Sequence, residues 1–116
     1  MATRELSRTP TATSRAFVAR WSDLLLSDDG QSMEFSQYTD KSVQVAGTFG
    51  GASIRIEGSN DGTNWAALTD PQGNDLLIVA PKIEQVTECT LYIRPVVVGG
   101  NGTTSLTVSM LCKEGN

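Results

Sequence analysis

Residues 43–65 read VQVAGTFGGASIRIEGSNDGTNW, and this stretch decides the fold class. Apolar and polar side chains alternate before the Gly50-Gly51 pair, over residues 41–49, and again after it, over residues 52–57. A period of two is the pattern of a β-strand with one buried face. Two adjacent glycines accept positive φ angles without steric cost, so we expect a hairpin turn between these two strands.

The rest of the chain repeats this rhythm of short strands and turns. Residues 59–64 and 99–102 are rich in Gly, Asn and Asp, and residues 70–74 contain Pro71, which suits a turn. We expect further strands at residues 65–68, 76–80, 83–86, 91–96 and 105–112. The sequence does not alternate strands with helices, as a parallel sheet requires. The pattern therefore predicts an all-β protein, an antiparallel β-sandwich of jelly-roll-like form.

The beginning of the chain has a different character. Residues 1–15 lack hydrophobic periodicity, contain Pro10 and are typical of a flexible, extended N-terminal arm. Residues 16–26 are rich in apolar side chains that fit either a short helix or a strand, because periodicity does not separate the two in so short a run. We therefore predict an arm over residues 1–15 and a single β-sandwich domain over residues 16–116.

Charge is distributed unevenly along the chain. Residues 1–20 contain four arginines and one glutamate, whereas residues 21–116 contain five basic and twelve acidic side chains; the two net charges, +3 and −7, add to −4. An acidic body is unsuited to neutralising phosphates, so we expect no direct nucleic-acid binding. The basic segment fits either a solvated terminus or an arm that docks on an acidic surface. No apolar run approaches the roughly 20 residues that span a bilayer, so we expect no membrane partner.

The residue types that carry most enzymatic chemistry are scarce. The sequence contains no histidine and two cysteines, Cys89 and Cys112, which excludes Ser-His-Asp and Cys-His arrangements and histidine-based zinc sites. Paired carboxylates serve glycosidases and calcium sites, but Asp61, Asp70 and Asp75 are close to turns, where Asp side chains more often cap the backbone. We therefore expect a protein that is not an enzyme, has no cofactor or metal, and keeps its cysteines as reduced thiols.

Four aromatic residues leave alternatives open. Trp65 follows a turn and fits either the sandwich core or, together with Tyr92, a stacking face for a sugar. Trp21 fits the core or an interface, and Phe17 shares its segment. If the N-terminal arm reaches a neighbouring subunit, Phe17 and Trp21 are natural anchors, since aromatic residues are enriched at the centres of interfaces.

Residues 43–65, together with LTDPQGN at residues 68–74 and IRP at residues 93–95, resemble small structural proteins of tailed bacteriophages. The resemblance is to head decoration, or cement, proteins of β-sandwich or jelly-roll type, and it covers about residues 41–112. The segment GSNDGTNW at residues 58–65 is also similar to a hairpin of discoidin-like and other adhesive sandwich domains. This motif therefore marks a turn geometry more surely than a function.

The resemblance implies a virion protein on the outer surface of the capsid, made in the host cytoplasm. Such proteins bridge neighbouring subunits of the major capsid protein, commonly as dimers or trimers, and resist the internal pressure of packaged DNA. A homo-oligomer without catalytic groups suits this role, because many weak contacts add through avidity. The candidate contacts with the capsid or with a second subunit are Arg4, Arg8, Arg15, Phe17 and Trp21.

Two other functions remain open at this stage. A carbohydrate- or receptor-binding module of a phage tail or baseplate would use exposed aromatic residues, with Trp65 and Tyr92 as the candidates. A head–tail ring component would instead form a ring through heterologous interfaces. A glycan-binding signal would favour the first function, and a ring of fixed larger size would favour the second.

Overall fold

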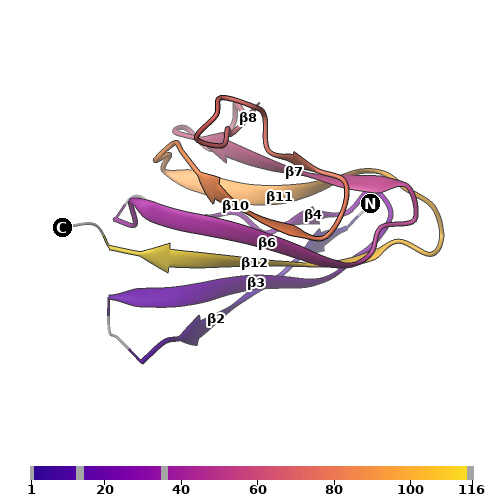
Figure 1. The fold of residues 1–116 in the computed structure, drawn as a ribbon, viewed down its shortest axis with the longest axis horizontal. Helices are drawn as coiled ribbons and strands as arrows, with labels where there is room; N and C mark the ends of the chain where they lie inside the picture. Colours follow the sequence, from indigo (N-terminus) through magenta and orange to yellow (C-terminus); the bar gives the residue numbers. More distant parts are fainter. Residues whose placement is uncertain (1, 13–14, 35–36, 115–116) are drawn as a thin grey trace.

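The computed structural model describes residues 2–12, 15–34 and 37–114, and it folds them into two β-sheets that pack as a sandwich (Figure 1). The seven-stranded sheet contains β1 (Thr3–Arg4), β4 (Asp29–Gly30), β5 (Met33–Glu34), β7 (Ala52–Ser59), β8 (Ala66–Ala67), β9 (Leu77–Ile78) and β11 (Tyr92–Gly99). The five-stranded sheet contains β2 (Leu6–Pro10), β3 (Ala16–Leu24), β6 (Asp40–Thr48), β10 (Lys82–Val86) and β12 (Ser105–Lys113). The named strands pair antiparallel, except that β1 runs parallel to β4. The predicted all-β antiparallel sandwich is confirmed.

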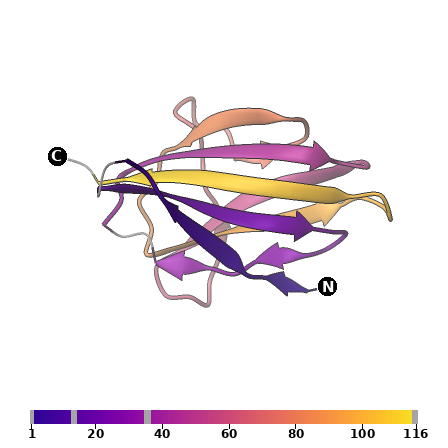
Figure 2. The ribbon, with the colours of Figure 1, turned by 90° about the horizontal axis from the view of Figure 1, so that it is seen from below.

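Each sheet is built around one long strand. In the five-stranded sheet the order is β10-β6-β12-β3-β2, so β12 lies in the middle, drawn in yellow in Figure 2. In the seven-stranded sheet β11 lies between β4 and β7. β6 and β7 follow one another in sequence but lie in opposite sheets, and so do β11 and β12. The jelly-roll-like assignment remains an interpretation of this order.

The Gly50-Gly51 turn differs from its prediction in one respect. Both glycines have positive φ, 57° and 83°, and Ala52 N donates to Phe49 O at 2.9 Å, so the tight turn is present. The turn is not a hairpin, however, because it joins strands of opposite sheets. β6 pairs with β12 and β10, and β7 pairs with β11, β8 and β9. A local turn pattern does not reveal which distant strands become neighbours.

Residues 16–26, which fitted either a helix or a strand, form the strand β3 over Ala16–Leu24. Phe17, Ala19 and Trp21 are buried, whereas the side chains between them are partly or fully exposed. This alternation is the two-residue period of a strand with one face on the core. β3 pairs with β12 on one side and with β2 on the other.

The N-terminal residues also differ from the expected extended arm. Thr3–Arg4 form β1 beside β4, and Leu6–Pro10 form β2 beside β3, so the segment crosses from one sheet to the other. Leu6 is half-buried against the core. The sequence pattern missed these strands because their partners lie well beyond the local window. Residues 1, 13 and 14 of the predicted arm lie outside the described residues.

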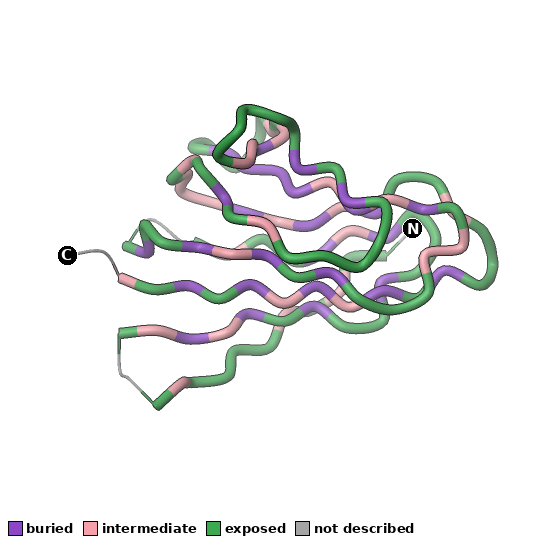
Figure 3. The backbone as a smooth tube through the Cα atoms, viewed as in Figure 1, coloured by how far each residue is buried: buried purple, intermediate pink, exposed green. Residues whose placement is uncertain are grey.

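The core fills the space between the sheets, and buried positions alternate with more exposed positions along β3, β6, β11 and β12 (Figure 3). Trp21 is completely buried, and most of the surrounding side chains are aliphatic. Cys112 in β12 is buried, Cys89 lies outside the named strands and is exposed, and neither forms a disulfide. Within the described ranges, no helix is long and apolar enough to cross a membrane.

Candidate interaction surfaces

The three arginines predicted to bind a partner all contact groups within the chain. Arg4 Nε lies 2.7 Å from Asp28 Oδ2, and Arg15 Nε lies 3.4 Å from Glu114 Oε2. The Arg8 guanidinium lies over the ring of Phe17, 4.0 Å from its centroid. A role of these arginines in binding the capsid or another subunit stays a prediction, and it has to compete with these internal contacts.

The carboxylate of Asp28 attaches the N-terminal segment to the sandwich. It is 3% exposed and accepts hydrogen bonds from Ala2 N at 3.0 Å, Leu25 N at 2.9 Å and Arg4 Nε at 2.7 Å. Burial by itself would raise the pKa of Asp28, but the hydrogen bonds and the Arg4 charge outweigh it and hold the pKa below its usual value. The ionised carboxylate therefore stabilises the position of β1.

The two predicted aromatic anchors are parts of the core. Phe17 packs edge-on against Tyr38 with ring centroids 4.8 Å apart, and both rings are buried. Trp21 Nε1 donates to Gln31 O at 2.9 Å, which satisfies the one polar atom of the buried indole. Both side chains thus lie in the core, and neither exposes a large apolar surface that a binding partner could contact.

Trp65 and Tyr92 lie on the outer side of the seven-stranded sheet and are both half-buried. The Arg94 guanidinium lies 4.0 Å from the centroid of the Trp65 ring, so one face of that ring already has a cation stacked on it. The adjoining turn is organised by Asp61, whose carboxylate accepts hydrogen bonds from the backbone of Asn64 and Thr63 and from the Asn64 side chain. These bonds hold the pKa of Asp61 well below its usual range. Asp61 acts as a turn cap, as predicted.

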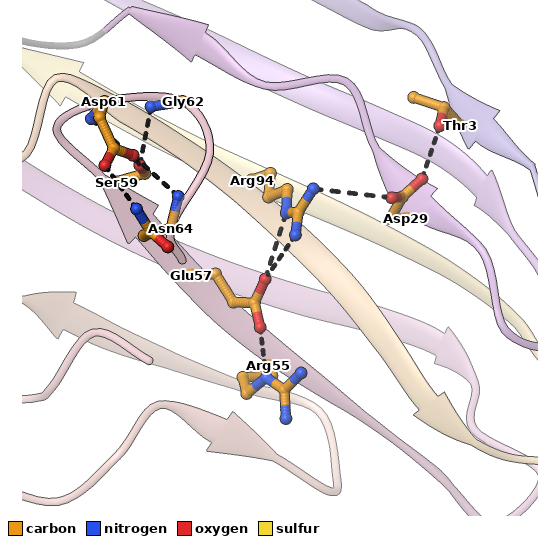
Figure 4. Close-up of polar contacts among 9 residues, drawn as sticks. All are labelled: Thr3, Asp29, Arg55, Glu57, Ser59, Asp61, Gly62, Asn64 and Arg94. Atoms are coloured by element: carbon orange, nitrogen blue, oxygen red, sulfur yellow. Dashed lines mark hydrogen bonds and ion pairs between the residues drawn. The ribbon is translucent and has the colours of Figure 1, made fainter. Parts of the chain in front are cut away.

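A buried carboxylate, absent from the sequence analysis, organises the same face. Glu57 on β7 is 6% exposed and accepts from Arg55 Nε at 2.7 Å and from Arg94 Nη2 at 3.0 Å. Arg94 also lies 3.9 Å from Asp29, whose carboxylate accepts from Thr3 Oγ1 at 2.8 Å (Figure 4). We call this surface the Glu57 face; it comprises Asp29, Arg55, Glu57 and Arg94, whose opposite charges neutralise one another. The alternation of Ile54 and Ile56 with charged neighbours could have indicated a charged outer face, but not the pairing across to β11.

The outer side of the five-stranded sheet has the opposite character. Two rows of directly opposed side chains run across it, set by the register of the five strands. We call this surface the β12 face, and its residues are Ser7, Thr9, Val18, Arg20, Ser42, Gln44, Ile83, Gln85, Ser109 and Leu111. All ten lie in the described part of the chain, and Arg20 is the charged residue among them. Ile83 is 62% exposed and Leu111 is 42% exposed.

Two neighbouring hollows lie on this face and meet at Ser42 and Leu111. One, of about 290 Å³, lies between Ile83 and Leu111 over Gln44 and Ser109. The other, of about 360 Å³, lies on the side of Leu111 nearer the end of β12. The first hollow is lined by apolar and uncharged polar side chains apart from Arg20. The second is bordered by Leu111 and also by Asp40, Lys41 and Lys113, so the charged side chains gather at that end of the face.

Two of the acidic side chains singled out in the sequence cap turns in the described part of the chain. The described residues contain no group of three or more His, Cys, Asp or Glu side chains placed to hold a metal ion. The Asp70 carboxylate, like that of Asp61, accepts backbone hydrogen bonds within its own turn, from Gln72 N and Asn74 N. The acidic side chains singled out in these two turns therefore stabilise the backbone.

Comparison with known proteins provides a fold but no family. No protein-family model matches the chain, and no curated protein matches it in sequence. Among solved structures, the SPBc2 prophage-derived protein YomS is similar with a TM-score of 0.66 at 11% identity, over 89% of this chain and 98% of that one. An oxalate oxidase is similar with a TM-score of 0.54 at 16% identity, over 94% of this chain. The chain spans about half the length of that enzyme, 50%. At these identities the similarities establish the shared fold.

Proposed function

We propose that this chain is a structural protein of a tailed bacteriophage particle, which decorates the outside of the capsid and bridges neighbouring subunits of the major capsid protein. The observation that supports this most is the similarity in fold to a small prophage-derived protein over 98% of that protein's length. The resemblance of residues 43–65 to phage decoration proteins points in the same direction and rests on sequence, independently of the fold.

The character of the surface supports a structural role over a catalytic one. On the Glu57 face the charged groups contact one another, and on the β12 face there are few charges and two exposed apolar side chains. Such surfaces suit contact with another protein surface, in which avidity adds many weak contacts. We accordingly propose a protein that acts without catalysis or cofactor and without direct contact to nucleic acid or membrane.

A carbohydrate- or receptor-binding role in a phage tail or baseplate is the second candidate, and one observation favours it. Trp65 and Tyr92 lie on the same outer side of the seven-stranded sheet, beside a rigid turn. The Arg94 side chain on the Trp65 ring argues against stacking of a sugar on that side of the indole. A head–tail ring component is the third candidate, and its mark would be a ring of fixed size.

Co-sedimentation tests the proposal. The purified protein is mixed with mature phage heads that have been stripped of their decoration protein, and heads that retain it are the control. We expect saturable binding at a fixed ratio to the major capsid protein on stripped heads and little binding on complete heads. Absence of binding to stripped heads would contradict the capsid role. Glycan binding that is lost in Trp65→Ala would then establish the second candidate.

A further inference from the structure

The sequence of β12 contains one outward position that breaks the pattern of a solvent-exposed strand. Ser105, Thr107 and Ser109 point outward and are polar, but the next outward residue is Leu111, which is 42% exposed. In the neighbouring row Ile83 of β10 is 62% exposed. These two apolar side chains border the hollow of about 290 Å³. The face thus carries protruding apolar groups and a recess beside them.

The distribution of charge shows what could approach this face. The whole chain has a net charge of −4, so two copies repel one another in most orientations. The acidic side chains of the named strands are divided equally between the sheets, with Asp29, Glu34 and Glu57 in the seven-stranded sheet and Asp23, Asp40 and Glu84 in the five-stranded sheet. The β12 face carries only Arg20 among its ten described residues, and the Arg20 Nε–H is turned back onto the sheet to donate to Ser109 Oγ at 3.2 Å. A contact between two copies made by these ten residues therefore brings no acidic side chains against one another.

The size of the face lies at the lower end of what a specific dimer buries. Five strands about 4.8 Å apart, with nine-residue central strands rising about 3.3 Å per residue, form a surface of roughly 20 by 30 Å. Two such planes bury about 1,200 Å² in total, and specific interfaces bury about 1,200 to 2,000 Å². The centres of such interfaces are poor in charge, as the ten residues of this face are.

We infer that two copies of this chain associate through the β12 face into a dimer with a two-fold axis. A two-fold interface uses the same patch on both subunits, so the patch must be complementary to itself. A protruding Ile83 beside a recess meets that requirement, since Ile83 of each copy enters the hollow next to Leu111 of the other. Short side chains such as Ser42 and Ser109 allow the two sheets to approach closely. The inference does not depend on the capsid role, because it concerns the protein alone.

Sedimentation equilibrium of the purified protein, without phage heads, tests the inference. We expect the wild-type chain, of 12.4 kDa, to form a dimer, and Leu111→Lys and Ile83→Lys each to weaken association at least about tenfold, since each buries an amine at the interface. Leu77→Lys is the matched control. Leu77 is 49% exposed and pairs with Arg55 on the opposite, seven-stranded sheet, so this variant should associate as the wild type does.

Circular dichroism establishes that each variant is folded, and all three positions are exposed enough for lysine to be tolerated. A monomeric wild type at the highest attainable concentration would overturn the inference and would leave the β12 face to a different protein. A wild-type trimer, or equal weakening by Leu77→Lys and Leu111→Lys, would also overturn it. If the protein does not form this dimer, the co-sedimentation test of the capsid role still applies, so the two proposals are tested separately.

Discussion

The two outer faces of this sandwich are built from the same kind of long strands, yet they differ in what they leave available. On the Glu57 face, Arg55, Glu57 and Arg94 contact one another. On the β12 face, the strands display mainly uncharged polar side chains beside the exposed Ile83 and Leu111. The outer side of the seven-stranded sheet also has an exposed apolar side chain, Leu77 beside Arg55, so the faces differ in their charged contacts. In the described part of the chain, no buried side-chain nitrogen or oxygen lacks a hydrogen-bond partner. The charged face is therefore already satisfied internally.

This difference teaches how to choose a binding surface from a structure. Residue type alone favours the Glu57 face, since Arg, Glu and Trp are common in functional sites. The contacts reverse that choice, because groups that already have partners must give them up before they bind anything else. Exposed apolar side chains have no such cost. The β12 face, which looks bland in the sequence, is the better candidate for a partner.

The largest expected difference between the faces is in their contribution to stability. Glu57→Ala leaves Arg55 and Arg94 without the carboxylate between them, and we expect it to lower the free energy of unfolding by about 2 kcal/mol. The loss is not larger because water can hydrate the two arginines in part. Ser109→Ala, at the centre of the β12 face, should change it by less than about 0.5 kcal/mol. Urea denaturation of both variants measures the two effects. Equal effects would remove the contrast between the faces.

A smaller effect is expected at Asp28, where β1 joins the charged sheet. Asp28→Asn should lower the free energy of unfolding at pH 7 by about 1 kcal/mol, since it removes a buried anion that three donors stabilise. The pKa of Asp28 is lowered from about 3.8 in the folded state, so its contribution is complete above that pH and is lost as pH falls through the folded pKa. The difference between wild type and variant should therefore narrow in acid. A constant difference from pH 7 to acid would contradict this account.

The smallest effect is expected at the exposed ion pair of Arg15 and Glu114. The two side chains are 58% and 39% exposed and lie 3.4 Å apart, so solvent screens their attraction. Arg15→Ala should change the free energy of unfolding by less than about 0.5 kcal/mol. The measurement is thermal or urea unfolding at low and high salt. If Arg15→Ala lowered the free energy of unfolding as much as Glu57→Ala, exposed and buried ion pairs would contribute equally to stability, and this account would be contradicted.

The sequence predicted the strands with strong alternation and missed what depends on distant pairing. Residues 41–49, 52–57, 91–96 and 105–112 alternate clearly and correspond to β6, β7, β11 and β12. The segments at residues 65–68 and 76–80 form only the two-residue strands β8 and β9, because their neighbours are turns fixed by side chains. β1 and β2 were missed, since their partners are Asp29 and Trp21 and local periodicity carries no trace of them.

The surfaces were less predictable than the strands. The arginines and aromatic residues chosen from the sequence proved to have contacts within the chain, as with Arg4 on Asp28 and Trp21 in the core. Sequence order places Glu57 and Arg94 37 positions apart, and only the pairing of β7 with β11 brings them together. Leu111 is different, because an apolar residue at an outward position of an otherwise polar strand face is visible in the sequence itself.

The central claim is that the β12 face is covered by a partner copy and the Glu57 face is not. Thiol labelling reports this at chosen positions, provided that the native cysteines are silent. Cys89 is exposed and is replaced by serine, and Cys112 is buried, which raises the pKa of its thiol to about 12 and keeps it unreactive. The probes are Leu111→Cys on the β12 face and Leu77→Cys on the opposite sheet.

The rate of alkylation of each probe is measured at low and at high protein concentration. The account predicts that labelling at position 111 slows as the concentration rises and that labelling at position 77 keeps the same rate, since association by mass action covers only the β12 face. Equal rates at both positions over the whole concentration range would contradict the claim. Slower labelling at position 77, with no change at position 111, would place the interface on the seven-stranded sheet and would contradict the claim directly.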